Sequence, residues 1–390
     1  MENRKHIIFL KVFSFGALLF ATPVFTFAYG IKTHALLTQE IAKFANHSFS
    51  GISLNADDQA SMMKGAIDED NGTRWLQHFY DPVHNRGLTF GNDKQVNPNL
   101  AFVGSAPIRS QWKSAKDWAI DTSSQASTNT LLSGIMGNYF GGHDDYSWDR
   151  GIYEYTWGDK KRGLESLGHV LHLIEDASVP DHTRNDPHPA LGKKLQEDIS
   201  FLAKPAIIAY LGNHNITNSS PYESFVTFGP GSVPIADTLK LENKKPIILN
   251  SLVEYFEGMA KYSNKNFFSR DTIFSTEFDD PKVDYYSDGF GYRKDNSIIR
   301  EVNKRDGSIE YTLKDNQDLI LKTYWSLLSQ QAVLHGAGVV KLFFDEVEKE
   351  KKTKVLYTKN RSWVGKRIDG FKQTAFGAVS LLYGSSVTQR

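Results

Sequence analysis

The chain has 390 residues, with 45 basic and 45 acidic side chains and a formal net charge of zero. This balance excludes a chain-wide basic field for nucleic acid and leaves only a local basic patch for that role. The absence of cysteine excludes disulfides and thiolate metal sites, so any metal must be held by His, Asp, Glu or backbone groups.

The N-terminal segment has the layout of a secretory signal peptide. Residues 1–28 have a short basic start and then an apolar run that ends in small residues, with Ala28 at the predicted cleavage site. The alternative is an uncleaved membrane anchor, but Lys11 and Pro23 interrupt the apolar run and favour cleavage. We therefore expect an exported protein, secreted or periplasmic, whose mature chain begins at Tyr29.

Apolar residues at helical spacing predict most of the remaining chain to be helical. In chain order, the expected helices cover residues 33–46, 57–70, 110–125, 159–178, 193–211, 248–268 and 316–352. Thr33 is expected to cap the first of these helices, and Pro180 to end the fourth. Residues 79–110 and 137–151 are rich in Gly and in Pro, Asn or aromatic residues, which predicts connections.

Residues 286–316 differ in kind, because β-type runs flank an Asp306-Gly307 turn. This pattern predicts a β-hairpin inserted at about 284–314 in a helical protein. The expected fold class is therefore all-α with a small β-hairpin insertion. Apart from the signal peptide, we expect a helical domain at 29–350 and a C-terminal extension at 351–390.

The stretch from residue 169 to residue 188 contains a third of the chain's histidines, interleaved with aspartates. These four are His169, His172, His182 and His188. His172 and Asp176 lie four positions apart and share one helix face, which suits a single metal ion, and His169 can reach the same face. His182 and His188 are expected on a loop that folds back. A lone histidine is more often structural, but this density of imidazoles and carboxylates favours metal binding.

Two upstream segments add candidate ligands. Asp68, Glu69 and Asp70 precede His78 by eight to ten residues, a pattern that on its own is typical of a capped helix end. His34 lies five residues after the predicted mature N-terminus. A free α-amine and its adjacent carbonyl can chelate a metal, so the cleavage site itself is a candidate part of the centre.

Taken together, these segments resemble the zinc-dependent phospholipase C and single-strand nuclease superfamily, all-helical proteins with a three-zinc cluster. The matching segments, in family order, are YGIKTH (29–34), GAIDED with HFYDP (65–82), LGHVLHLIEDASVPDH (167–182), PYESFV (221–226) and LLSQQAVLHGAGVVKLFFDE (327–346). The resemblance spans about residues 29–347. The central segment is specific, whereas the first and last are weak alone.

The resemblance implies a ligand set for three zinc ions (Zn2+). Asp70, His78, His172 and Asp176 would hold the first ion; Asp176, His34 and the amine and carbonyl of Tyr29 the second; and His182, His188 and Glu223 the third. Asp70 is preferred to Asp68, because the family places an acidic residue just before this ligand, as Glu69 does here. Asp70 would also orient or deprotonate the attacking water. His169 has no ligand counterpart and is expected beside the ligands or in the core.

Three features depart from the family pattern. The first mature residue is Tyr29 where the family usually has Trp, although its amine and carbonyl would still bind. His188 and Glu223 lie 35 residues apart, whereas the family often places this pair one helical turn apart, so Glu223 is the weakest ligand assignment. The β insertion and the C-terminal extension have no recognised counterpart.

The resemblance implies an exported trinuclear-zinc phosphodiesterase, of the phospholipase C type on phospholipids. One alternative is a single-strand-specific zinc nuclease, which needs aromatic side chains for base stacking and a basic track for phosphates. Another is an exported zinc-binding protein without catalytic activity. The expected partner is a phospholipid or nucleotide phosphodiester substrate. A membrane surface is a candidate peripheral contact, and no obligate protein partner is evident.

Overall fold

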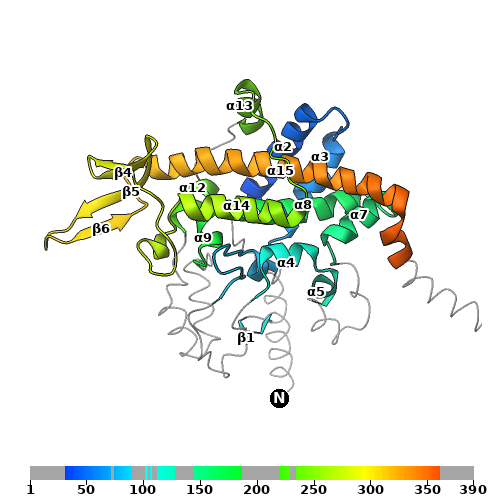
Figure 1. The fold of residues 1–390 in the computed structure, drawn as a ribbon, viewed down its shortest axis with the longest axis horizontal. Coiled ribbons are helices and arrows are strands. Elements are labelled where there is room, and N and C mark those ends of the chain that lie inside the picture. Colours follow the sequence, from blue (N-terminus) through cyan, green and yellow to red (C-terminus); the bar gives the residue numbers. More distant parts are fainter. Residues whose placement is uncertain are drawn as a thin grey trace, which may run out of the picture.

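The computed structural model describes residues 31–71, 74–89, 102–103, 106–107, 112–127, 144–186, 220–228 and 234–360. Several predictions fall outside these residues: the signal peptide with its cleavage site at Ala28, Tyr29, His188, the helix at 193–211 and the chain after residue 360. The described part is mainly helical, with a small antiparallel sheet at one end (Figure 1).

The helices agree with most of the expected ones. They are α2 (Ile31–Ser48), α3 (Ala56–Asp68), α4 (Ala115–Ile120), α5 (Thr122–Ser127), α7 (Trp148–Trp157), α8 (Lys160–Asp176), α9 (Pro180–Thr183), α12 (Pro221–Phe228), α13 (Ile235–Leu241), α14 (Leu252–Asn266) and α15 (Leu319–Thr353), with 3-10 turns at Arg74–Gln77 and Arg270–Thr272.

Helix α8 is the central helix of the fold. Every residue from Ser166 to Asp176 is buried, which is typical of a helix surrounded by protein on all sides. It packs against α3 and α7, and also against α2 and α15. Helix α15 runs along the length of the molecule (Figure 1) and packs across α2, α7 and α8. The histidines and aspartates of α8 therefore lie deep in the core.

Two glycines bring α3 and α8 into close contact. A Cβ atom on Gly65 would lie 1.9 Å from the carbonyl oxygen of Glu165, and one on Gly168 would lie 1.9 Å from that of Met62. Only glycine fits at such distances, so any larger side chain at either position would push the helices apart. This contact brings the end of α3, and Asp70 just after it, close to the buried face of α8.

Several helix boundaries differ from those predicted. Thr33 lies inside α2 rather than at its N-cap. Helix α8 ends at Asp176, and Pro180 is the first residue of α9, where the missing N–H of proline costs nothing. The predicted helix at 110–125 divides at Asp121 into α4 and α5. Helix α7 begins within the predicted connection at 137–151.

The predicted hairpin is a four-stranded antiparallel sheet instead. Its strands β3 (Tyr285–Ser287), β4 (Phe290–Arg293), β5 (Asn296–Asn303) and β6 (Ile309–Thr312) pair in chain order. The expected turn at Gly307, with φ of 83°, joins β5 to β6. The Tyr324 hydroxyl on α15 donates to the Ile298 carbonyl at 2.8 Å and fastens the sheet to the helical core. A separate two-residue pair joins β1 (Phe102–Val103) to β2 (Ala106–Pro107).

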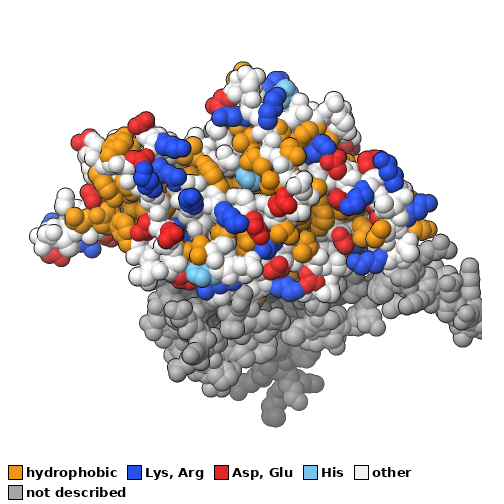
Figure 2. All heavy atoms as spheres, viewed as in Figure 1, with side chains coloured by type: hydrophobic (Ala, Val, Ile, Leu, Met, Phe, Trp, Pro, Cys, Tyr) orange, Lys and Arg blue, Asp and Glu red, His pale blue; other side chains and the backbone are white. Residues whose placement is uncertain are grey.

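The surface of the described residues carries both charge signs. On the face shown in Figure 2, Lys and Arg side chains are interspersed with Asp and Glu side chains and with small apolar areas. Among the described residues, no helix combines the length and the hydropathy that a membrane crossing requires.

Candidate metal centre

Buried imidazoles and carboxylates from separate parts of the chain converge beside α8. His34 lies on α2, Asp70 just after the end of α3, and His78 just after the first 3-10 turn. His172 and Asp176 both lie on α8. Each side chain has an exposed fraction of 1% or less. Two sets, His34 with His172 and Asp176, and Asp70 with His78 and His172, place one potential ligand atom each within 4.8 Å of one another.

Asp176 lies between imidazoles on two sides. Its Oδ2 atom is 2.9 Å from His78 Nδ1 and 3.1 Å from His172 Nε2. Its Oδ1 atom is 3.5 Å from His34 Nε2. The two oxygens of one carboxylate thus face different nitrogen donors, which is the arrangement that a carboxylate needs to contact two cations.

Asp70 lies at the edge of this cluster. Its Oδ1 atom is 3.7 Å from His172 Nε2 and 3.8 Å from His78 Nδ1. Among the described residues, neither oxygen of Asp70 has a hydrogen-bond partner of normal geometry, and the same holds for both oxygens of Asp176. Buried carboxylates that lack well-aligned hydrogen bonds are costly, and a bound cation would remove that cost. The donor set therefore fits a metal ion.

Asp68 and Asp70 differ in the structure in whether they can be metal ligands. Asp68 points toward solvent, with its side chain 33% exposed, and pairs with Lys64 at 2.8 Å. Asp70 is buried and faces the imidazoles. Of the two aspartates that the sequence leaves open, only Asp70 lies where it can contact an ion in the cluster.

The cluster shifts the pKa values of its members strongly. Burial raises the pKa of Asp70 to about 6. Although burial opposes it, the charge of Asp176 raises the pKa of His78 to about 10 and also raises that of His172. Burial likewise opposes ionisation of Asp176, but the neighbouring imidazoles hold its pKa well below its usual range. The carboxylates of this cluster thus stabilise positive charge on the groups that lie between them.

In His34 and His172, the ring nitrogen that faces away from Asp176 has an acceptor beside it. His34 Nδ1 lies 2.6 Å from Glu175 Oε2, and His172 Nδ1 lies 2.6 Å from the Ala66 carbonyl oxygen. These contacts orient Nε2 of both rings toward Asp176. Metal-binding histidines in proteins show this pattern, because a partner on the far nitrogen fixes the tautomer and the ring orientation.

A second group of candidate ligands joins α9 to α12. His182 Nε2 lies 3.0 Å from Glu223 Oε1, and both side chains are buried. His182 Nδ1 is 3.2 Å from the His78 carbonyl oxygen and 3.8 Å from Asp176 Oδ2, so this group adjoins the first. The prediction that His182 lies on a loop was wrong, because it lies on the short helix α9.

The segment after His78 holds α9 in place. The Tyr80 amide donates to the His182 carbonyl at 3.1 Å, and the ring of Phe79 stacks on that of His182 with centroids 4.4 Å apart. The buried Arg184 guanidinium donates to the Asn264 carbonyl at 2.7 Å and ties the end of α9 to α14. Both sides of His182 are therefore fixed by the fold.

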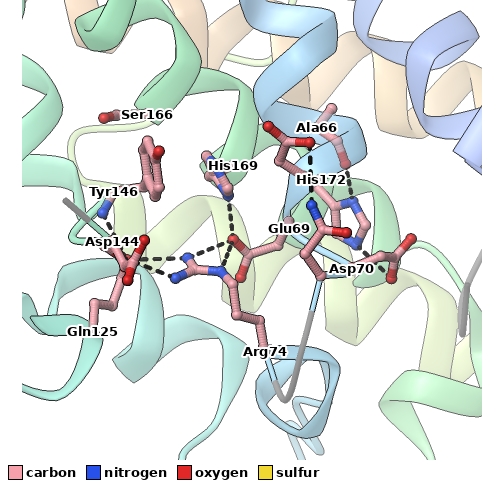
Figure 3. Close-up of polar contacts among 12 residues, drawn as sticks. Ala66, Glu69, Asp70, Arg74, Gln125, Asp144, Tyr146, Ser166, His169 and His172 are labelled. Atoms are coloured by element: carbon pink, nitrogen blue, oxygen red, sulfur yellow. Dashed lines mark hydrogen bonds and ion pairs between the residues drawn. The ribbon is translucent and has the colours of Figure 1, made fainter. Parts of the chain in front are cut away.

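A buried ionic network centred on Glu69 supports Asp70 (Figure 3). Arg74 donates two hydrogen bonds to Glu69 Oε2, at 2.8 and 2.6 Å, and His169 Nδ1 bonds to the same oxygen. Trp118 Nε1 donates to Glu69 Oε1 at 2.9 Å. Burial lowers the pKa of His169 to about 4. His169 therefore lies beside the cluster without reaching its centre, in the position that the sequence predicts.

The roles of two glutamates become visible only in the structure. Glu69 and Glu175 each directly precede a candidate ligand, Asp70 and Asp176. Both are fully buried, and each receives hydrogen bonds from elements that carry or support the candidate ligands. The repeated Glu-Asp pair is a pattern in the sequence that would have indicated this arrangement.

A third group of potential ligands has a different role. The buried Asp81 lies close to the exposed His84 and Glu277. The Arg86 guanidinium donates to Asp81 at 2.9 Å and also contacts Glu277, so a cationic side chain already lies between the two carboxylates. This group is an ion-paired turn.

The structure thus brings together every predicted ligand that it describes. These are His34, Asp70, His78, His172, Asp176, His182 and Glu223. Tyr29 and His188 lie outside the described residues, and their ligand roles stay predictions. The described residues thus include buried clusters of His, Asp and Glu that can bind metal ions.

No family model and no curated protein matches the chain. Among solved structures, the chain is similar to the alpha toxin from Clostridium absonum, with 14% sequence identity and a TM-score of 0.36. The match covers 81% of this chain and 64% of the toxin chain, so it spans less than two thirds of the toxin's length. Similarity at this level assigns neither a family nor an activity.

Proposed function

We propose that this chain is an exported zinc-dependent phosphodiesterase of the phospholipase C type, which hydrolyses a phosphodiester bond of phospholipids. The observation that carries the proposal is the position of Asp176, with Oδ2 beside His78 and His172 and Oδ1 beside His34. A single buried carboxylate that faces nitrogen donors on two sides is suited to a multinuclear centre. The segments that resemble the zinc phospholipase C and nuclease superfamily contain these same residues.

The chemistry of the donors favours zinc. Imidazole nitrogens and carboxylate oxygens suit Zn2+, whereas Mg2+ prefers oxygen ligands alone. The proposed stoichiometry is three ions, with the third held by His182, His188 and Glu223. When bound, zinc ions supply Lewis-acid stabilisation of phosphoryl charge and make a nucleophile available near neutral pH.

Asp70 is the proposed catalytic residue. It lies at the edge of the cluster, so one carboxylate oxygen can face the first ion while the other orients a water molecule or accepts a proton from it. An ionised carboxylate in this position can act as a general base. The Glu69 network keeps the Asp70 backbone in place during this step.

A phospholipid is preferred to nucleic acid as the substrate. A single-strand nuclease needs a basic track for phosphates. The chain has as many acidic as basic side chains, 45 of each, and so has no net positive charge. This balance supports a substrate whose recognition does not depend on a strong positive field.

The test is a parallel assay of the purified mature protein on phosphatidylcholine micelles and on single-stranded DNA. We expect hydrolysis of phosphatidylcholine, its loss in Asp70→Asn, and its retention in Asp68→Asn, because Asp68 lies outside the cluster. Activity on DNA alone would overturn the substrate assignment in favour of a nuclease. A protein that binds zinc but cleaves neither substrate would overturn the enzymatic assignment.

A further inference from the structure

Glu175 is a buried carboxylate that faces away from the centre of the cluster. Successive side chains on a helix point about 100° apart, so Asp176 can face the imidazoles while Glu175 faces α2. There Glu175 contacts two residues one helical turn apart. Its Oε1 atom accepts a hydrogen bond from the Thr38 hydroxyl at 2.7 Å, and its Oε2 atom lies 2.6 Å from His34 Nδ1.

The contact between Glu175 and His34 determines which ring nitrogen of His34 faces Asp176. The contact with Glu175 engages Nδ1 and leaves Nε2 directed at Asp176 Oδ1, 3.5 Å away. The ring is also stacked on that of His172, with centroids 3.6 Å apart, so its plane is fixed. Thr38 engages the other oxygen of Glu175, so both carboxylate oxygens contact α2.

We propose that Glu175 is a positioning residue for the metal position formed by His34 and Asp176. It keeps the proton of His34 on Nδ1, so that Nε2 presents its lone pair to the ion, and it thereby sets the affinity of that position. The inference rests on the proposed function, because it concerns the same centre. Glu175 itself contacts no ion, yet it controls whether an ion binds at the position formed by His34 and Asp176.

A purely structural role for Glu175 makes a different prediction. If the carboxylate only clamps α2 to α8, removing either of its two contacts lowers stability and leaves the choice of His34 nitrogen unaffected. Thr38→Val removes the hydroxyl contact and keeps the contact with His34. Glu175→Gln keeps the shape, but its amide offers one acceptor and one donor, so one of the two contacts must reverse. Comparing these two variants separates the two roles.

The experiment measures zinc affinity by competition with a chelator, together with the free energy of unfolding of the full-length mature protein. We expect E175Q to weaken one zinc position about 10- to 100-fold, as loss of such an orienting partner does in other zinc proteins. We expect T38V to lose stability and keep wild-type zinc affinity. Glu40→Gln is the matched control, because Glu40 is another buried glutamate, on α2, whose partners are Lys43 and the Ala236 amide. It should bind zinc like the wild type.

Equal losses of zinc affinity in E175Q and T38V, or wild-type affinity in E175Q, would overturn the inference. If E175Q does not fold, nitrogen-15 NMR of the histidine rings in zinc-loaded wild-type protein decides the question. A proton on Nδ1 of His34 with zinc on Nε2 supports the inference, and any other state of that ring contradicts it. A wild-type protein that binds no zinc would refute the proposed function as well, whereas unchanged zinc binding in E175Q refutes only the role of Glu175.

Discussion

His182 Nε2 and Glu223 Oε1 lie 3.0 Å apart, although 41 positions separate the two residues in the chain. Both are buried, on the short helices α9 and α12. The pair therefore joins two helices that are distant in the sequence, and only the tertiary fold brings the two side chains together.

This pairing predicts that Glu223 contributes to one metal position alone. Glu223→Gln should lower the zinc content by one ion and reduce hydrolysis, because an amide is a much poorer zinc ligand than a carboxylate. The two ions proposed beside Asp176 should remain. Zinc content measured by emission spectroscopy checks the prediction, with Ser224→Ala, at the adjacent half-buried position on α12, as the control. Unchanged zinc content in E223Q would exclude Glu223 as a ligand.

His172 can offer only Nε2 to an ion, because its Nδ1 bonds to the Ala66 carbonyl, so its loss should remove a ligand from the first proposed ion. His172→Ala should remove at least one zinc ion and reduce hydrolysis to background. The matched control is His335→Gln, which alters another buried histidine, on α15, that faces Gly258 instead of the cluster. H335Q should keep its zinc and its activity. Full activity in H172A would rule out the assignment of the centre.

The Glu69 network should contribute strongly to stability. Glu69→Gln leaves Arg74 buried without its charged partner, and breaking a buried ion pair from one side costs about 3 kcal/mol or more. We expect the free energy of unfolding to fall by about that amount in urea titrations. Glu165→Gln, which alters a half-buried glutamate paired with Lys64, should change it by less than about 0.5 kcal/mol. Similar small losses in both variants would show that the network is not a major source of stability.

His335 predicts a specific dependence of stability on pH. Burial lowers its pKa from 6.5 to about 4, so the folded protein keeps this histidine neutral while the unfolded chain binds a proton below pH 6.5. The free energy of unfolding should therefore fall as the pH drops from 6.5 to 4, by up to about 3 kcal/mol from this residue, and level off below pH 4. H335Q lacks the histidine and therefore lacks this pH-dependent contribution to the free energy of unfolding. The stability difference between wild type and H335Q should change across this window, and parallel pH curves would contradict the prediction.

Periodicity alone predicted the helix that carries the centre. Apolar residues at helical spacing gave a helix at 159–178, and α8 spans Lys160–Asp176. The spacing of four between His172 and Asp176 predicted a shared face, and Asp176 Oδ2 lies 3.1 Å from His172 Nε2. Such local relationships follow from helix geometry, so they are accessible before the fold is known.

Other features depend on tertiary contacts that no local pattern contains. Gln or Asp in place of Glu175 would fit the helical pattern of α8 equally well, and only the position of α2 gives this carboxylate its partners. Part of the four-stranded sheet could have been predicted from the sequence. Asp288-Gly289 is a second Asp-Gly turn, with positive φ at both residues, and it joins β3 to β4. The close contact of α3 with α8 at Gly65 became evident only from the structure.

The most direct test of the central claim is a crystal structure of the purified mature protein with anomalous scattering measured at the zinc absorption edge. The proposal predicts an anomalous peak among Asp70, His78, His172 and Asp176, a second beside His34 and Asp176, and a third beside His182 and Glu223. Protein crystallised with zinc available and showing no peak at Asp176 would contradict the account.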